Sequence, residues 1–262
     1  GVTYVGVAVI ASIGSYIAPE LVKGMDYKTT LQIMGAFLLL AWPVAFFLIS
    51  DHPSEKGQLP DGEQTESEAV AREAAEPPKK FSDLLGSKTF WLLLLGSACS
   101  IGAIGAINAH MKLIFGDQGF VDQEARNAIW RVASMCMLWA SIFGRLGLGW
   151  AADRFSRKRV MLLTYVLVAG TIPLLLLVTP DQTYFVYIFA LLFGFGMGAD
   201  YMLIPLMAAD QFGLTSLGRA MSLILPGDTI GQTWFPRWLA QLKGAVAGGY
   251  GTALWAVFGV AM

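Results

Sequence analysis

The sequence predicts an all-α integral membrane protein, a bundle of about eight membrane-spanning helices. Its 262 residues are 55% hydrophobic and only 14% charged, with a mean hydropathy of +0.57, which excludes an ordinary soluble domain. The apolar residues gather in runs of about 20, the length that crosses the hydrocarbon core. A dense basic loop at residues 154–159 joins two of these runs, and we expect it on the cytoplasmic side.

Long apolar runs and one polar stretch set the predicted order of elements. Residues 1–19 and 30–50 are expected to form the first two spans. A connector rich in acidic residues and proline follows over residues 51–88, with one helical piece at residues 66–75. Six spans come next, at residues 90–115, 129–152, 160–178, 184–208, 217–242 and from residue 247. The chain starts and stops within apolar runs, which indicates a fragment of a longer protein.

One of these spans contains a proline–glycine pair near its middle, in the sequence LPGD from Leu225 to Asp228. Proline removes a helix hydrogen bond, and glycine loosens the backbone. We therefore expect the helix over residues 217–242 to be interrupted at this point, which would expose backbone groups at mid-membrane. The alternative is a plain proline kink.

Three charged residues, Arg145, Asp200 and Asp228, are predicted to lie deep in three different spans. At about 1.5 Å per residue, each lies roughly 12–15 Å from the cytoplasmic end of its span. Charged residues inside membranes are rare and usually face a water-filled interior. We therefore expect the three to share one polar chamber. The alternative is that Arg145 is permanently neutralised by one of the aspartates as a structural pair.

The loop after residue 148 carries the most specific motif. Residues 149–158 read GWAADRFSRK and resemble the loop signature G-x-L-A-D-R-x-G-R-[KR] of the major facilitator superfamily. Ser156 replaces the usual glycine, and the matching residues are Gly149, Ala152, Asp153, Arg154, Arg157 and Lys158.

This resemblance implies a major facilitator type bundle of two six-helix halves, of which the first four helices are missing here. Residues 1–50 then form the last two helices of the N-terminal bundle, residues 51–88 the cytoplasmic connector, and residues 89–262 the C-terminal six-helix bundle. It also implies a cytoplasmic latch in which Asp153 pairs with a basic residue or a helix N-terminus. The latch residues are Gly149, Asp153, Arg154, Arg157 and Lys158. The alternative is that these bases only set the membrane topology.

Three further segments are similar to the monocarboxylate and oxalate/formate transporter branch of that superfamily. They read INAHMKLIFGDQGF, IFGRLGLGWAADR and GFGMGADYMLIPLMAADQFG. The resemblance implies that Arg145 binds the substrate carboxylate, for which its planar guanidinium offers two parallel donors. Asp228 stands where oxalate/formate members carry a lysine, which favours a monocarboxylate with proton coupling over a dicarboxylate.

Six polar residues are the candidates for substrate binding: Arg145, Asp228, Asp200, Tyr201, Asn108 and His110. Asp228 is the first candidate to carry a coupling proton, and Asp200 is the second. His110 lies toward the outer end of its span, where a gate or packing role is as plausible as proton transfer.

Together these features predict a secondary active transporter of a small organic anion, a monocarboxylate, by proton symport or anion exchange with alternating access. We expect a multi-pass protein of the cell membrane, the inner one in a bacterium, with the missing helices as its partners. Efflux of amphipathic compounds and a transporter-like ligand receptor are the alternatives. A net charge of −1 gives no sign of nucleic-acid binding. No motif indicates an enzyme, a metal site or a cofactor.

Overall fold

The computed structural model describes residues 24–39, 41–48, 78–245 and 249–262. The chain divides into two compact units, one with the described residues before Lys79 and one with those from Lys79 onward. The predicted span over residues 1–19 and the helical piece at residues 66–75 lie outside the described residues.

The first unit contains α2 (Tyr27–Leu39) and α3 (Ala41–Leu48), where the sequence predicted one span over residues 30–50. The α2 helix begins earlier than expected. The backbone amide of Thr30 donates a hydrogen bond to the backbone carbonyl of Asp26, with the nitrogen and oxygen 3.0 Å apart. Most of the large apolar side chains described in this unit are exposed, as expected for a helix that faces lipid or other helices.

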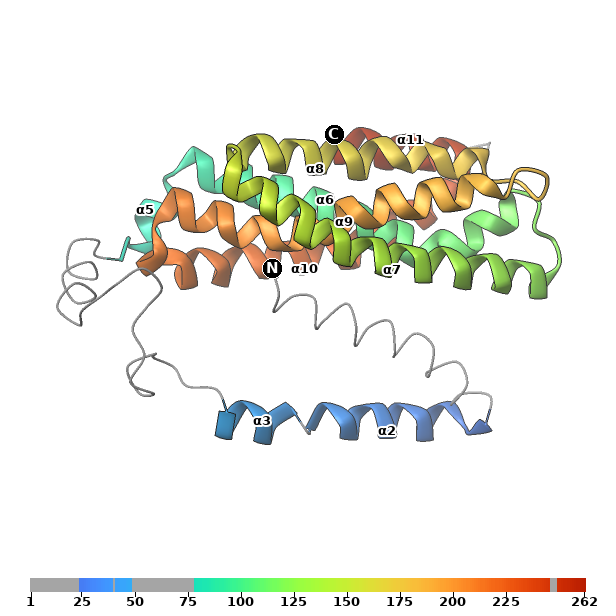
Figure 1. The fold of residues 1–262 in the computed structure, drawn as a ribbon, viewed down its shortest axis with the longest axis horizontal. Helices are drawn as coiled ribbons and strands as arrows, with labels where there is room; N and C mark the ends of the chain where they lie inside the picture. The colour runs from blue at the N-terminus through green and yellow to red at the C-terminus, as the bar shows by residue number, and fades with distance from the viewer. Residues whose placement is uncertain (1–23, 40, 49–77, 246–248) are drawn as a thin grey trace. The chain divides into compact units, whose positions relative to one another are not determined.

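The second unit is a bundle of long helices that lie side by side (Figure 1). Its helices are α5 (Phe81–Leu85), α6 (Lys88–Asp117), α7 (Gln123–Arg154), α8 (Arg157–Thr171), the 3-10 helix η2 (Ile172–Leu177), α9 (Tyr184–Phe212), α10 (Leu214–Ala245) and α11 (Tyr250–Ala261). Among the residues that the structure describes, four helical segments are long and apolar enough to cross a membrane: α6, α7, α8 with η2, and α9. The described residues contain no β-strand.

The α7 helix starts at Gln123, so the start predicted for this span at residue 129 is too late. Asp122 explains the early start, because its carboxylate accepts a hydrogen bond from Ala125 Nα at 2.8 Å and so caps the helix. At the other end of α7, Ser156 has φ −57°, which any residue adopts. The turn into α8 therefore needs no glycine at this position.

The α10 helix is continuous through the LPGD sequence, so the predicted interruption is wrong. Its backbone packs tightly on α6, where a Cβ atom on Gly231 would overlap the carbonyl oxygen of Ala98. Neighbouring helices can hold a membrane helix together across a proline, and here α6 lies along α10 for most of its length. Pro226 itself lies on the exposed side of α10.

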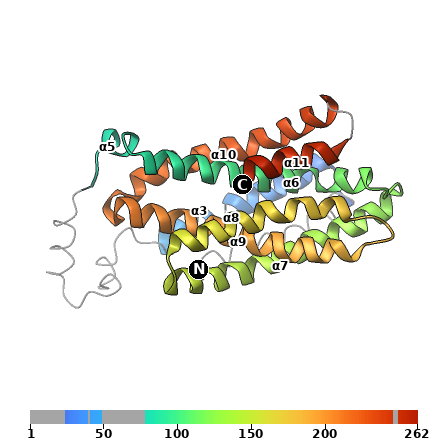
Figure 2. The ribbon, with the colours of Figure 1, turned by 90° about the horizontal axis from the view of Figure 1, so that it is seen from above.

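Two helix pairs form the centre of this unit, α6 with α10 and α7 with α9 (Figure 2). Glycines bring each pair into backbone contact. In the second pair, a Cβ atom on Gly144 would overlap the Phe195 carbonyl, and one on Gly198 would overlap the Ser141 carbonyl. Small residues allow such close approach, and the contact area gained is what holds membrane helices together.

Replacing Gly198 by alanine is expected to destabilise the bundle by about 1–3 kcal/mol, because the added methyl group forces α7 and α9 apart. The measurement is thermal unfolding in detergent. Gly170→Ala is the matched control, since its Cβ atom would meet no atom within 4 Å. Equal melting temperatures for the two variants would contradict the close packing of α7 on α9.

The segment that leads into the bundle is attached to the ends of α9 and α10. The backbone amide of Lys79 donates a hydrogen bond to Ser216 Oγ at 2.9 Å. The side-chain ammonium of Lys79 donates a hydrogen bond to the Gln211 carbonyl at 3.2 Å. Arg219 donates in turn to the Lys79 carbonyl at 2.9 Å. The end of the predicted connector is therefore ordered against the bundle.

Candidate functional site

A cavity of about 320 Å³ lies among α6, α9 and α10. Its lining is mostly apolar, with Ile101 from α6, Ile204 and Pro205 from α9, and Met221 and Leu225 from α10. The polar groups that reach it are Tyr201, Asp228, Thr229 and Gln232. This volume lies at the small end of the range for ligand pockets, roughly 300–1,000 Å³.

Asp228 is the acidic residue of the cavity wall, and only 7% of it is exposed. Its Oδ1 atom accepts a hydrogen bond from Ser97 Oγ on α6 at 2.6 Å. Across the cavity, Gln232 Nε2 donates to the hydroxyl of Tyr201 at 3.4 Å, which links α10 to α9. The polar part of the lining is thus held by contacts between helices.

Asp200 is completely buried on α9, one residue before Tyr201. Its Oδ2 atom accepts a hydrogen bond from Ser100 Oγ on α6 at 2.6 Å. Its Oδ1 atom has no hydrogen-bond partner among the described residues. Asp200 and Asp228 lie close enough for their like charges to interact.

Ser97 and Ser100 are functional candidates that the sequence prediction missed. They lie three residues apart, so successive turns of α6 present both hydroxyls on the same side of the helix. One helix therefore holds both buried carboxylates. The signal that was available is this pair of hydroxyls at helical spacing in an otherwise apolar span.

Arg145 lies on α7, with 7% of it exposed. The neighbouring Gly144 allows the close contact with α9. Tyr201 lies close enough to Arg145, Asp200 and Asp228 to interact with each of them electrostatically. Arg145 and Asp200 are not among the residues that line the cavity, whereas Tyr201 and Asp228 are.

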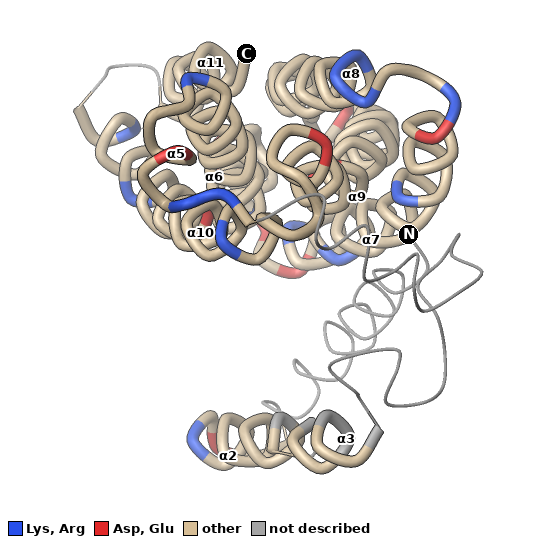
Figure 3. The backbone as a smooth tube through the Cα atoms, turned by 90° about the vertical axis from the view of Figure 1, so that its left-hand side faces the viewer, with Lys and Arg blue, Asp and Glu red and all other residues tan. Residues whose placement is uncertain are grey.

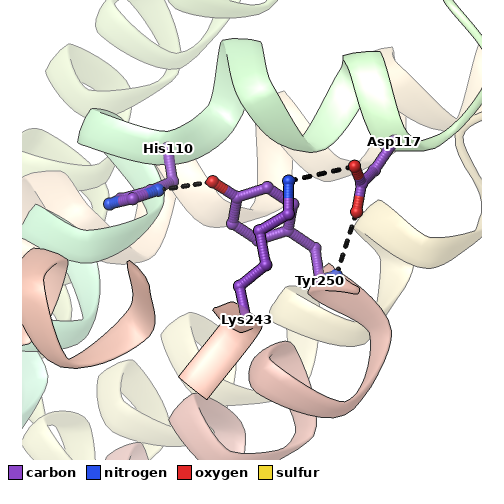
Figure 4. Close-up of polar contacts among 4 residues, drawn as sticks. All are labelled: His110, Asp117, Lys243 and Tyr250. Carbon is purple, nitrogen blue, oxygen red and sulfur yellow. Dashed lines mark hydrogen bonds and ion pairs between the residues drawn. The ribbon is translucent and has the colours of Figure 1, made fainter. Parts of the chain in front are cut away.

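Asn108 and His110, the other two predicted binding residues, lie closer to the end of α6. Asn108 is exposed, and its Nδ2 atom is 3.7 Å from the Met197 sulfur. His110 Nδ1 lies 2.6 Å from the hydroxyl of Tyr250, the first residue of α11 (Figure 4). Neither of them lines the cavity described above.

His110 belongs to a polar cluster that joins three helices, shown in Figure 4. The carboxylate of Asp117, at the end of α6, accepts two hydrogen bonds. One comes from Lys243 Nζ at 3.0 Å and the other from the backbone amide of Tyr250 at 3.1 Å. The Lys243 ammonium also lies 4.2 Å from the centre of the Tyr250 ring. The cluster ties α6, α10 and α11 together at this end of the bundle.

Replacing Tyr250 by phenylalanine is expected to lower stability by about 0.5–1.5 kcal/mol, because the hydrogen bond between the Tyr250 hydroxyl and His110 is lost while the packing of the ring is kept. Thermal unfolding in detergent measures this, with the exposed Tyr184→Phe as the control. A melting temperature unchanged from the parent would show that the bond between α6 and α11 adds no stability.

The predicted latch lies at the opposite end of the bundle, which faces the viewer in Figure 3. Arg157, at the start of α8, forms an ion pair with Asp210 on α9. The guanidinium of Arg154 lies over the ring of Trp150 at 4.5 Å. Asp153 and Lys158 are exposed, and Gly149 allows Met202 to approach α7. The role of Asp153 in a latch stays a prediction.

No group of three or more His, Cys, Asp or Glu side chains in the described ranges has the spacing of a metal site. The polar side chains of the cavity wall, Tyr201, Asp228, Thr229 and Gln232, offer charge and hydrogen bonding. Apolar helices of spanning length, with buried charges beside a small cavity, are typical of membrane transport proteins.

The chain belongs to the Major Facilitator Superfamily, whose family model matches residues 1–236. It is a multi-pass integral membrane protein of a family of transporters.

Two relatives match the chain over stretches of different length. It is 34% identical to the MFS transporter asaE of Aspergillus flavus over 92 residues, which is 35% of this chain and 21% of that protein. It is 25% identical to the uncharacterized MFS-type transporter YhjX of Escherichia coli K12 over 234 residues, which is 85% of this chain and 52% of YhjX. The chain thus spans about half the length of YhjX.

Proposed function

We propose that this chain is part of a secondary active transporter that moves a small monocarboxylate, together with a proton or in exchange for another anion. The observation that carries the proposal is the position of Arg145. This arginine is buried on α7 and lies close enough to Tyr201, a residue of the cavity wall, to interact with it electrostatically. A guanidinium stays charged even in a low-dielectric environment and binds a carboxylate through two parallel hydrogen bonds.

The remaining cavity wall is suited to a short organic anion. The apolar side chains of α9 and α10 can contact its hydrocarbon part, while the second amide hydrogen of Gln232 can donate to its oxygens. Asp228 and Asp200 are the two candidates for the proton that accompanies it, one facing the cavity and one buried behind it. Alternating access then follows from rocking of the two halves of the full-length protein.

The test is uptake of labelled monocarboxylates into proteoliposomes that contain the full-length protein, with and without an inward proton gradient. Accumulation that depends on the gradient supports symport. Uptake that depends on an anion loaded inside the vesicles supports exchange. If no labelled monocarboxylate is taken up, either with a proton gradient or with an anion loaded inside the vesicles, the proposal is overturned.

Efflux of amphipathic compounds is a second candidate function, and the mostly apolar lining of the cavity favours it. Such a transporter would lower the accumulation of a fluorescent amphipathic dye in cells that express it. Dye efflux without any uptake of a monocarboxylate would favour this second function.

A further inference from the structure

The first turn of α8 carries two bases that point away from the bundle. Arg157 faces inward, because its guanidinium forms an ion pair with Asp210 on α9. Successive residues of a helix are rotated by about 100°, so Lys158 and Arg159 lie on other sides of α8 than Arg157. Both are exposed, and neither side chain has a hydrogen bond or an ion pair among the described residues (Figure 3). These two cations are therefore available to a partner outside the bundle.

The side of α8 that continues from these bases is apolar and open. Leu162, Leu163 and Val166 are 62%, 51% and 44% exposed. They follow Arg159 at the spacing that places side chains on one side of a helix. Gly170 lies on the same side, and a Cβ atom there would meet no atom within 4 Å. We call these four residues the open side of α8.

This surface has the length of one membrane leaflet. The helix rises by about 18 Å from Lys158 to Gly170, and half of the hydrocarbon core is about 15 Å thick. Tryptophan gathers at the membrane surface, and Trp150 lies near the end of α7 with the guanidinium of Arg154 4.5 Å from the centre of its ring. The two free bases of α8 thus lie at headgroup level, with the open side of α8 at the level of the acyl chains.

The charge at this end of the bundle favours an anionic headgroup. Residues 153–159 contain four bases and one acid, Asp153, and only Arg157 among the bases has an acidic partner in the described part of the chain. A phosphate beside Lys158 and Arg159 gains charge-assisted hydrogen bonds. A zwitterionic headgroup gains less, because its own cation is repelled by the same bases. Of the four described segments of spanning length, α8 with η2 is also the most apolar, which suits contact with acyl chains.

We propose that Lys158, Arg159 and the open side of α8 form a binding site for an anionic phospholipid. The two bases bind the headgroup phosphate, and one acyl chain lies along Leu162, Leu163 and Val166. The site is separate from the cavity and does not depend on the proposed substrate.

The experiment uses the purified full-length protein, freed of lipid in detergent. Phosphatidylglycerol or phosphatidylcholine with identical acyl chains is added in increasing amounts, and native mass spectrometry gives the dissociation constant of each lipid. In a third arm, glycerol 3-phosphate is added at the same concentration as phosphatidylglycerol, because it has the phosphate without the acyl chains. We expect phosphatidylglycerol to bind at least tenfold more tightly than phosphatidylcholine and to resist displacement by glycerol 3-phosphate.

Replacing Arg159 by glutamine is expected to weaken the binding of phosphatidylglycerol about fivefold, and replacing Lys158 and Arg159 together roughly 10–30-fold. Binding of phosphatidylcholine should stay within twofold of the parent in both variants. Arg131→Gln is the matched control, since it removes an exposed base at the other end of α7 and should leave both dissociation constants unchanged.

Three results would overturn the proposal. Equal affinities of the parent protein for the two lipids would show that the open side of α8 is covered by the missing helices instead. An equal loss in Arg159→Gln and Arg131→Gln would show that the preference depends on overall charge rather than on this site. Displacement by glycerol 3-phosphate would show that the bases bind a free phosphate.

Discussion

Replacing Arg145 by lysine is expected to lower kcat/KM for monocarboxylate uptake by roughly 10–100-fold. Lysine keeps the positive charge but not the planar fork, so one of two charge-assisted hydrogen bonds to the carboxylate is lost. The measurement is initial uptake into proteoliposomes over a range of substrate concentrations.

Arg131→Lys is the matched control for this variant. Arg131 lies on the same helix with its side chain exposed, so the same change of chemistry occurs away from the cavity. Transport by Arg145→Lys at the rate of the parent protein would show that Arg145 does not bind the substrate carboxylate.

Replacing Asp228 by asparagine is expected to reduce the preference for monocarboxylates over dicarboxylates by roughly 100-fold. In the parent protein the Asp228 carboxylate faces the cavity and repels a second carboxylate on the substrate. Two unit charges roughly 6 Å apart repel each other by about 3 kcal/mol at an effective dielectric constant of about 20. Competition of each acid against a labelled monocarboxylate measures the change.

Asparagine keeps the size of the side chain and can still accept a hydrogen bond from Ser97, so the cavity should keep its shape. Asp181→Asn serves as the control for loss of one negative charge at the surface. If the ratio of the two inhibition constants is the same in Asp228→Asn and in the parent, Asp228 has no part in selecting substrate charge.

The helices themselves could be predicted well from local sequence. The span predicted at residues 184–208 begins at the same residue as α9 (Tyr184–Phe212), because an apolar run and its polar flanks are local features. Two features were predicted wrongly, the start of α7 and an interruption of α10. The Asp122 cap extended α7, and packing against α6 kept α10 intact across Pro226.

The candidate site was predicted in part. Arg145, Asp200 and Asp228 stand out in sequence because charges in apolar spans are rare. Their partners do not stand out, since Ser97 lies 131 residues from Asp228 and Ser100 lies 100 residues from Asp200. His110 was a candidate for its chemistry, whereas its contact with Tyr250 depends on how α11 packs.

Sequence alone determined that this protein is a multi-pass helical membrane protein with a basic loop at residues 154–159 and three buried charges. Those properties depend on the free energy of moving each residue type into hydrocarbon, which is a local quantity. Only the tertiary structure decided that α6 pairs with α10 and α7 with α9, and that Ser97 and Ser100 of α6 hydrogen-bond the two buried carboxylates. Helix pairing depends on the matching of glycine and side-chain surfaces distant in sequence, so no single segment contains it.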